Sequence, residues 1–100
     1  MNYKSEYSER AKKELIQSWI WYENQQALLG DEFIKTLNNK IKKKKKYPER
    51  FPERSRNFRE ATIKVFPFLI IYRIIKKQKR IIISSIFHTK RNPKKKYRKI

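Results

Sequence analysis

The stretch that decides the fold is Phe68–His88, which reads FLIIYRII, KKQK and RIIISSIFH over residues 68–75, 76–79 and 80–88. The first and last pieces are rich in isoleucine and aromatic residues, which suit the pleated surface of a strand. The four polar residues between them suit a turn. Ile81–Ile83 is apolar at three successive positions, which indicates burial on both faces, as in a central strand. The stretch therefore predicts two strands joined by a polar turn, the last of them inside the sheet.

The residues before this pair predict a further strand. From Phe58 onward the apolar side chains recur at every second position, which is the period of a strand. They are Ala61, Ile63 and Val65. Pro67 interrupts the pattern. Residues 48–57 contain Pro52 and five charged residues, and we predict that they form a loop.

A first helix is predicted nearer the N-terminus. Ser8 is predicted to be its N-cap, followed by Glu9, whose charge suits the positive end of the helix dipole. Apolar residues then recur at helical spacing as far as about Ala27 and predict the side that faces the core. These residues are Ala11, Leu15, Trp19 and Tyr22, with Ile16 and Ile20 widening the stripe. Before Ser8, the alternation of Tyr3, Ser5 and Tyr7 with charged residues predicts a short first strand.

The second helix is predicted to follow after a short break at Leu28–Asp31. Gly30 is expected to be the C-terminal cap of the first helix, and Asp31 the cap of the second. The apolar side of the second helix consists of Phe33, Ile34, Leu37 and Ile41. Tyr47-Pro48 ends it, because proline has no amide hydrogen and disfavours helix in the preceding residue. The two helices are therefore expected to form an antiparallel hairpin.

The order of these elements is strand, helix, helix and three strands, which predicts an α+β fold of the form β-α-α-β-β-β. The helical hairpin is expected to cover one face of a mostly antiparallel sheet. The other face, together with the tail, is left open for function. One hundred residues suffice for one domain. We expect that domain to span residues 1–96, followed by a basic tail of residues 97–100.

The charge of the chain is its strongest compositional signal. Twenty-eight lysines and arginines against nine acidic residues give a formal net charge of +19. Such a chain repels itself and attracts polyanions or acidic proteins at long range. Part of the excess is attributed to the lysine-rich coding of an AT-rich genome. The rest indicates an acidic partner.

The composition also excludes several classes of protein. There is no cysteine, hence no disulfide framework and no thiolate metal site, which fits a reducing compartment. The longest apolar stretch, residues 66–72, is far shorter than the ~20 residues of a membrane span. The N-terminus has no run resembling a signal peptide. The only glycine is Gly30, so no glycine-rich nucleotide loop is present. We expect a soluble, cytoplasmic protein without cofactor or metal.

Several blocks of the sequence, with their order and spacing, resemble the RelE/ParE family of plasmid-stabilisation toxins. The blocks are Ala11–Leu15, Trp21–Glu23, Leu29–Phe33, Tyr47–Pro48, Phe66–Tyr72 and Ile86–Pro93, and the likeness covers residues 2–96. The resemblance implies a bacterial toxin that a co-expressed antitoxin holds inactive. It also implies one of two activities. RelE-like members enter the ribosomal A site and cut messenger RNA, whereas ParE-like members bind DNA gyrase and are not nucleases.

The sequence departs from the RelE-like nucleases at a position that their catalysis needs. Those nucleases place an arginine three positions before the tyrosine that matches Tyr72, and this chain has Leu69 there. A second family arginine falls near Thr89, with Arg91 two residues further on. The departure at Leu69 favours the ParE-like activity.

Candidate catalytic residues for RNA cleavage nevertheless lie near the end of the last strand. His88 is the sole histidine, and an imidazole with a pKa near 6.5 can act as acid or base at cellular pH. Lys90 and Arg91 can stabilise a phosphorane. Tyr97 can act as a weak acid or stack on a base, and Arg59 on a neighbouring strand can join them. The competing interpretation is structural: a packed His88, a solvated Arg91 and a packed or disordered Tyr97.

Two basic segments are candidates for binding nucleic acid or a partner. In the run Lys42–Lys46, the side chains of Lys42, Lys43 and Lys46 can grip phosphates, or they are solvated charges at the negative end of the helix dipole. A second cluster interleaves arginines with Phe51 and Phe58, as on RNA-stacking surfaces, or its phenylalanines enter the core. Its arginines are Arg50, Arg54, Arg56 and Arg59.

The two tryptophans differ by two helical positions and cannot share a face. Trp19 lies on the apolar stripe and is predicted to be in the core. Trp21 is expected to be partly exposed, either where a partner docks or as a packed edge.

Three functions remain open at this stage. The first is a ParE-like toxin that inhibits gyrase by binding, favoured by Leu69. The second is a RelE-like, ribosome-dependent mRNA endonuclease, supported by the charge and by His88, Lys90 and Arg91. The third is a nucleic-acid-binding protein without a toxic role, supported by the charge alone. For a toxin we expect a hetero-oligomer, in which an acidic antitoxin, disordered when alone, folds across the basic sheet and the hairpin.

Overall fold

The computed structural model describes residues 3–50, 53–55, 57–63 and 65–97, and it confirms the predicted α+β fold. Its elements in chain order are β1 (Lys4–Tyr7), α1 (Glu9–Gln25), α2 (Leu29–Lys46), β2 (Glu53–Ser55), β3 (Phe58–Thr62), β4 (Phe68–Ile75) and β5 (Arg80–His88), with 3-10 turns η1 (Pro48–Arg50), η2 (Lys76–Gln78) and η3 (Pro93–Lys95). No helix of the described residues has the length and apolar content that a membrane span requires.

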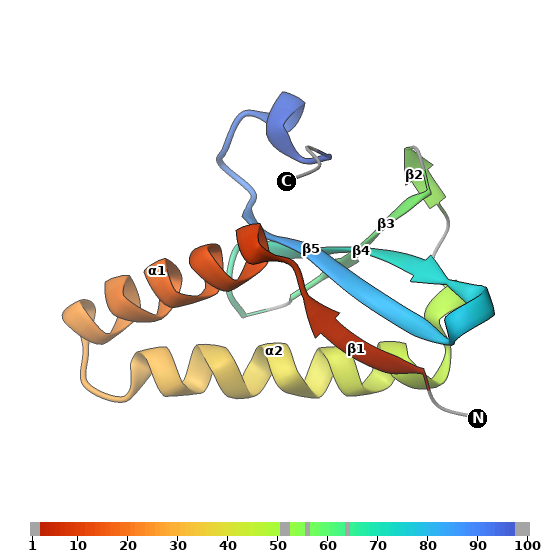
Figure 1. The fold of residues 1–100 in the computed structure, drawn as a ribbon. Helices are drawn as coiled ribbons and strands as arrows, with labels where there is room; N and C mark the ends of the chain where they lie inside the picture. Colours follow the sequence, from red (N-terminus) through yellow and green to blue (C-terminus); the bar gives the residue numbers. More distant parts are fainter. Residues whose placement is uncertain (1–2, 51–52, 56, 64, 98–100) are drawn as a thin grey trace.

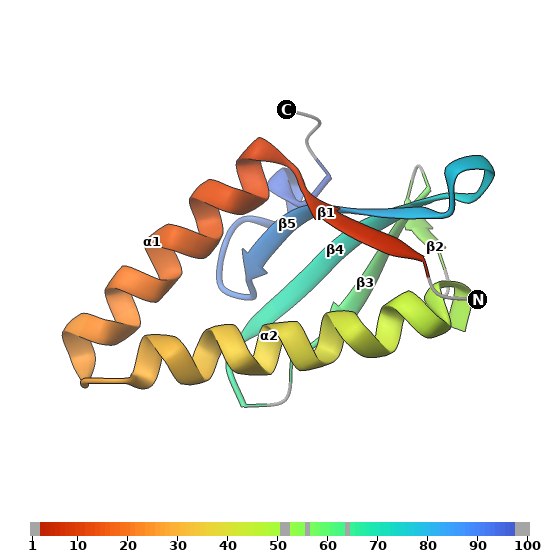
Figure 2. The same cartoon turned by 60° about the horizontal axis from the view of Figure 1, so that its bottom comes forward.

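The strands form one sheet in the order β1-β5-β4-β3-β2. β1 runs parallel to β5, and the other neighbours are antiparallel. β5 therefore lies inside the sheet, as the run Ile81–Ile83 predicts. The two helices cover one face of the sheet, and the C-terminal segment lies on the opposite side (Figures 1 and 2). The fold thus divides the molecule into a helix-covered face and a face covered in part by the segment between β5 and Tyr97.

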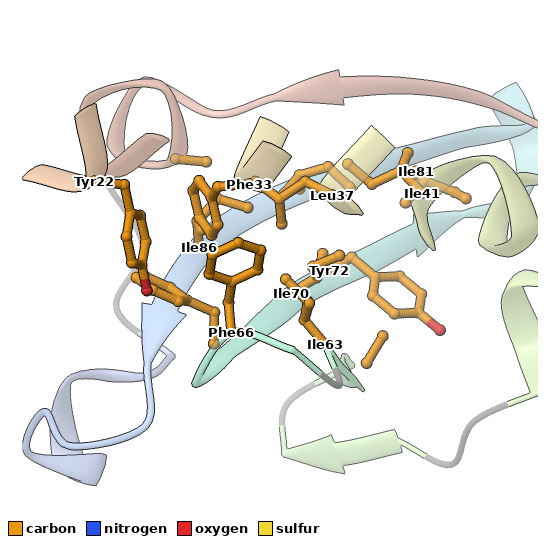
Figure 3. Packing of buried hydrophobic residues seen from close by; sticks show 14 residues of the cluster. Tyr22, Phe33, Leu37, Ile41, Ile63, Phe66, Ile70, Tyr72, Ile81 and Ile86 are labelled. Atoms are coloured by element: carbon orange, nitrogen blue, oxygen red, sulfur yellow. The ribbon is translucent and has the colours of Figure 1, made fainter. Parts of the chain in front are cut away.

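The main core fills the space between α2 and the sheet (Figure 3). Phe33 and Leu37 of α2 are fully buried, as are Ile70 and Tyr72 of β4. Full burial of a side chain of this size contributes about 1.5–3 kcal/mol. The hydroxyl of Tyr72 donates to the carbonyl oxygen of Pro48 at 2.9 Å, which ties the end of the helical hairpin to the sheet.

Ser8 caps α1, as predicted. Its Oγ accepts the amide hydrogen of Ala11 at 3.1 Å and donates to the carbonyl oxygen of Ser84 at 2.9 Å. Its own amide donates to the carbonyl oxygen of Ile83. One serine therefore starts the helix and continues the β1–β5 pairing past the end of β1.

The predicted burial of Trp19, Ile16 and Ile20 is wrong. Their exposed fractions are 38%, 58% and 47%. Successive residues turn by about 100° around a helix, so Ile16 lies about 100° from Leu15. The sheet covers only a narrow strip of α1, and Ile16 and Ile20 lie outside that strip. Trp19 lies beside the start of α2, where its indole Nε1 donates to Oδ1 of Asp31 at 2.9 Å.

The turn between the helices also differs from the prediction. α1 ends at Gln25, and the left-handed residue is Leu28, with φ 70°, rather than Gly30. Gly30 lies inside α2, where a Cβ would come within 2.7 Å of the backbone oxygen of Trp19. The capping role predicted for Asp31 is taken by Glu23, whose carboxylate accepts the amides of Leu28 and Asp31 at 3.2 Å each. The glycine is required by the close approach of two helices, and not by a left-handed conformation.

Two smaller differences concern the segment around β3. The predicted loop at residues 48–57 contains η1 and the short strand β2, which pairs with β3 and extends the sheet to five strands. Val65 was expected to continue the buried alternation, but its side chain is 79% exposed. β3 has already ended at Thr62, so the period of two no longer applies there.

Candidate functional site

A cavity of about 460 Å³ opens between α1 and the C-terminal end of β5. Its lining combines aromatic walls with a few polar groups, a composition typical of binding pockets. The lining residues are Glu14, Gln17, Ser18, Trp21, Tyr22, Phe68, Ile86, His88 and Arg91. The cavity brings together two predicted catalytic candidates, His88 and Arg91, and the predicted docking residue Trp21.

Glu14 organises one wall of this cavity. Its Oε1 accepts the hydroxyl of Ser85 at 2.7 Å and the amide of Ile86 at 3.1 Å. Its Oε2 forms ion pairs with Arg10, at 3.3 Å, and with Arg91. The side chain is only 11% exposed, and a carboxylate so buried requires partners of this kind. Glu14 therefore joins α1, the edge of β5 and the segment after β5.

His88 occupies the end of β5 on the same side. Its ring lies edge-on to the ring of Phe68, with 4.9 Å between centroids. Its Nδ1 accepts the amide hydrogen of Lys90 at 3.1 Å, and its carbonyl oxygen accepts the amide of Arg91. A ring whose Nδ1 is an acceptor carries its proton on Nε2 in the neutral form. The turn brings His88, Lys90 and Arg91 together through backbone bonds, and the side chain of Lys90 is exposed outside the cavity lining.

The guanidinium of Arg91 is engaged on two sides. Its Nη1 pairs with Glu14, and its Cζ lies 4.7 Å from the centroid of the Phe87 ring. A carboxylate contact offsets much of the field that an arginine exerts on an approaching anion. Arg91 is thus a structural clamp as well as a candidate binding residue.

The second face of the sheet holds a separate apolar cluster. Phe58, Ile71 and Phe87 are fully buried there, with Leu69 and Tyr97 packed against them. The Tyr97 ring stacks on Phe58 at 5.2 Å between centroids. The sheet face that was expected to be open is therefore partly covered by the chain's own C-terminal segment.

Polar contacts hold that segment in place. The hydroxyl of Tyr97 donates to Oε2 of Glu60, and Nζ of Lys96 lies 3.5 Å from the same oxygen. Arg10, which is buried, donates from Nη2 to the carbonyl oxygen of Lys95 at 2.6 Å. The position of Tyr97 is thus that of a packed residue hydrogen-bonded to an acid.

Arg59 does not join the His88 group. It pairs with Tyr72 across β3 and β4, whereas His88 pairs with Phe68. Four residues along a strand separate these positions by about 13 Å. Nη1 of Arg59 lies 3.5 Å from the carbonyl oxygen of Glu49. Arg56, the other arginine predicted to bind a partner in this region, lies outside the described residues.

The other predicted binding residues lie on the helices. Lys42, Lys43 and Lys46 are exposed in the last two turns of α2. Trp21 is 58% exposed at the mouth of the cavity, with its ring edge-on to Tyr22 at 5.0 Å. This exposure agrees with the expectation for Trp21.

Sequence patterns did not reveal Glu14, Arg10 or Glu60. Glu14 and Arg10 lie on adjacent turns of one helix. Pairs of opposite charge at i, i+4 occur on many exposed helix faces, so this spacing does not indicate a buried site. The one available signal was that both occur on α1 close to the buried Ala11, on the side that packs against the sheet. Among the described residues, no three histidines and carboxylates are close enough together to hold a metal ion.

Comparisons with known proteins agree with this geometry. A chain of a solved structure described as the chromosomal ParDE TA system from P. aeruginosa superimposes with a TM-score of 0.76 at 15% identity, covering 88% of this chain and 97% of that one. A chain of the intact E. coli RelBE toxin-antitoxin complex gives 0.68 at 17% identity, covering 89% and 99%. At such identities the likeness shows the fold.

A search of curated proteins gives no match. The family model of the ParE toxin of the type II toxin-antitoxin system, parDE, matches residues 6–93. That match covers both α-helices and all the strands, apart from the first two residues of β1. This chain belongs to the ParE toxin family of type II toxin-antitoxin systems.

Proposed function

We propose that this toxin arrests growth by binding DNA gyrase, as a ParE-like inhibitor, and that it does not cut RNA. The observation that carries the proposal is the environment of Leu69. Where the RelE-like nucleases have an arginine, this leucine packs against the apolar cluster of Phe58, Ile71 and Phe87. The leucine is partly buried at the margin of that cluster, where it adds apolar contact surface. The surface supplies contact area at this position, and no charge for a phosphorane.

The arrangement of the remaining candidates supports the same function. Phosphoryl transfer relies on cations preorganised toward the developing charge. The guanidinium of Arg91 is instead turned to Glu14, and the exposed Lys90 is not among the residues that line the cavity. Gyrase and the ribosome are both cytoplasmic, so either activity places the toxin in the cytoplasm.

One observation favours the alternative of an mRNA endonuclease. His88 and Arg91 line the same cavity, together with the carboxylate of Glu14. A histidine, a carboxylate and an arginine around one cavity can supply an acid, a base and a phosphate contact. The test below therefore includes both residues.

Neutralisation is proposed to occur on the helical hairpin, by an acidic antitoxin. Two solved structures with this fold are described as a ParDE TA system and as a RelBE toxin-antitoxin complex. In this chain α1 exposes a row of large apolar side chains, Ile16, Trp19 and Ile20, and Trp21 is exposed at the mouth of the cavity. An amphipathic helix with an acidic outer side can bury such a row, and the +19 charge accelerates its capture.

The test separates the two activities in living cells and with purified components. His88→Ala and Arg91→Ala are expressed next to wild type, and each is checked for retained binding to the co-expressed antitoxin, which shows that it is folded. We expect growth arrest and DNA damage signalling to survive both changes, and purified toxin to inhibit gyrase supercoiling. RNA 5′-end mapping is expected to show no new cleavage sites. Ribosome-dependent cuts that disappear in His88→Ala would replace the gyrase proposal with the nuclease.

A further inference from the structure

The lysines of this chain are segregated along the molecule. Residues 14–34 contain no lysine or arginine, although lysine and arginine together make up 28 of the 100 residues of the chain. The same stretch holds four of the nine acidic residues: Glu14, Glu23, Asp31 and Glu32. Compositional drift toward lysine would not leave such a gap. The charge therefore follows the fold.

The opposite end of the molecule gathers cations from three separate segments. The amide of Tyr3 donates to the carbonyl oxygen of Lys45, and the amide of Lys4 to that of Lys79, each at 2.9 Å. These bonds place the start of β1 between the end of α2 and the β4–β5 turn. Figures 1 and 2 show all three at one end, with the α1–α2 turn at the other.

We call this end the lysine pole and define it by its cations. They are Lys4, Lys42, Lys43, Lys45, Lys46, Lys76, Lys77, Lys79 and Arg80, all exposed except the partly buried Lys45 and Arg80. Two acidic residues accompany them. Glu6 pairs with Arg80, and Glu49 pairs with Lys76 at 3.2 Å.

Folding alone does not account for this arrangement. The negative end of the α2 dipole favours lysine in the last turn of that helix. It does not explain why cations of β1 and of the β4–β5 turn meet there too, because bringing like charges together costs stability. An external polyanion that occupies the pole removes that cost.

We propose that the lysine pole binds the phosphate backbone of duplex DNA without reading its sequence. This inference rests on the proposed function, since gyrase is a target that itself holds DNA. Lysine is a point charge suited to phosphates, and it lacks the planar fork by which arginine reads guanine edges. The lysines of α2 rise by about 1.5 Å per residue, so Lys42 and Lys46 are offset by about 6 Å. That offset is close to two steps between backbone charges on one strand of B-DNA, because each step is about 3.4 Å along the axis.

An acidic protein segment fits the pole less well than DNA does. Peptide partners that fold on binding rely on apolar anchors as well as charge. The large exposed apolar residues of α1 lie in the stretch without cations, whereas Tyr47 is the one large apolar side chain exposed near the end of α2 among the described residues. The apolar hairpin is therefore left to the antitoxin, and the pole to phosphates.

The experiment measures binding of the full-length chain, free of antitoxin, to a fluorescent 30-base-pair DNA duplex by anisotropy at several salt concentrations. The pole variant is Lys42→Gln/Lys46→Gln/Lys77→Gln. The matched control is Lys12→Gln/Lys13→Gln/Lys35→Gln on the helical hairpin, which changes the net charge equally. Each lost phosphate contact lowers the slope of log K against log salt by about 0.9. We expect the pole variant to lose two to three units of slope and at least tenfold in affinity at low salt, and the control to keep the wild-type slope.

Equal losses of affinity and slope in the two variants would show that binding depends on net charge alone, and would overturn the inference. Two competitors identify other occupants. Duplex RNA of the same length that binds much more tightly than the DNA would point to RNA, and displacement of the DNA by an acidic polyglutamate peptide at comparable concentration would point to protein. The outcome is separable from the proposed function. If wild type inhibits gyrase without binding DNA, only the proposed DNA binding by the lysine pole is refuted. If wild type binds DNA without affecting supercoiling, only the gyrase proposal is refuted.

Discussion

At the scale of single residues, buried polar groups decide how the two halves of the fold are joined. Glu14 gathers four donors from α1, β5 and the segment after β5, and Tyr72 links β4 to the backbone after α2. Both side chains carry buried polar groups that have hydrogen-bond partners. Removing those partners would destabilise the fold, because a buried polar group without a partner has lost its hydration. The ionisation of Tyr72 can also be followed through its effect on the stability of the protein.

The pH dependence of stability is expected to report on Tyr72. Burial raises the pKa of Tyr72 to about 12, and Arg59 nearby opposes the rise. The unfolded chain releases this proton near pH 10 while the folded chain still holds it. The contribution of Tyr72 to stability is therefore intact below pH 10 and lost between pH 10 and pH 12.

The measurement compares urea unfolding of wild type and Tyr72→Phe at pH 8 and at pH 11.5. At pH 8 the variant is expected to be about 1 kcal/mol less stable, because it lacks the hydrogen bond to Pro48. Between pH 8 and pH 11.5 the stability advantage of wild type over the variant should fall by about 2 kcal/mol, so that it vanishes or reverses. Taking the difference removes the titration of the other tyrosines and of the lysines. A gap that is independent of pH would show that the buried hydroxyl ionises as readily as in the unfolded chain.

At the scale of elements, periodicity predicted the two helices and every strand except β2, but not the side-chain contacts between them. β4, β5 and the end of α2 were predicted at their observed bounds, because isoleucine runs, a polar turn and Tyr47-Pro48 are local signals. The burial of Trp19 was predicted wrongly, since an apolar stripe does not say how wide a strip the neighbouring sheet covers. The cavity between α1 and β5 had no local signal either. It depends on Glu14 meeting residues 71 to 77 positions away in the chain.

Gly30 shows what such a contact requires. It is the second residue of α2, and in a helix interior alanine is about 1 kcal/mol better than glycine on propensity alone. A Cβ there would lie 2.7 Å from the backbone oxygen of Trp19, and backbone cannot move aside cheaply. We expect Gly30→Ala to lower the free energy of unfolding by about 1–3 kcal/mol, as overpacked sites do.

The control for Gly30 lies two residues away. Leu28 has a φ of 70° and a side chain that is 68% exposed, so Leu28→Gly relieves left-handed strain and loses little packing. Its stability in urea is expected to equal or exceed that of wild type. A stable Gly30→Ala protein would mean that the helices separate easily at this turn.

At the scale of the whole molecule, charge and apolar surface are separated. Residues 14–34 of the helical hairpin carry exposed apolar side chains and four acidic residues, and the opposite end of the molecule carries the lysine pole. The longest dimension of the molecule is 41 Å, several times the Debye length of about 8 Å at physiological salt. Two partners can therefore bind the two ends without sensing each other through charge.

The segregation predicts an opposition between stability and binding. Neutralising lysines at the pole relieves repulsion, so Lys42→Gln/Lys46→Gln/Lys77→Gln should raise the free energy of unfolding by about 0.5–1 kcal/mol at 50 mM NaCl. At 500 mM NaCl, where the Debye length falls to about 4 Å, the gain should largely vanish. The hairpin triple Lys12→Gln/Lys13→Gln/Lys35→Gln removes cations near the acidic stretch and should give no gain at either salt concentration. Urea unfolding of the three proteins at both concentrations checks this. If the pole variant is no more stable than the hairpin variant at low salt, the lysines do not repel one another measurably, and their convergence requires no polyanion to explain it.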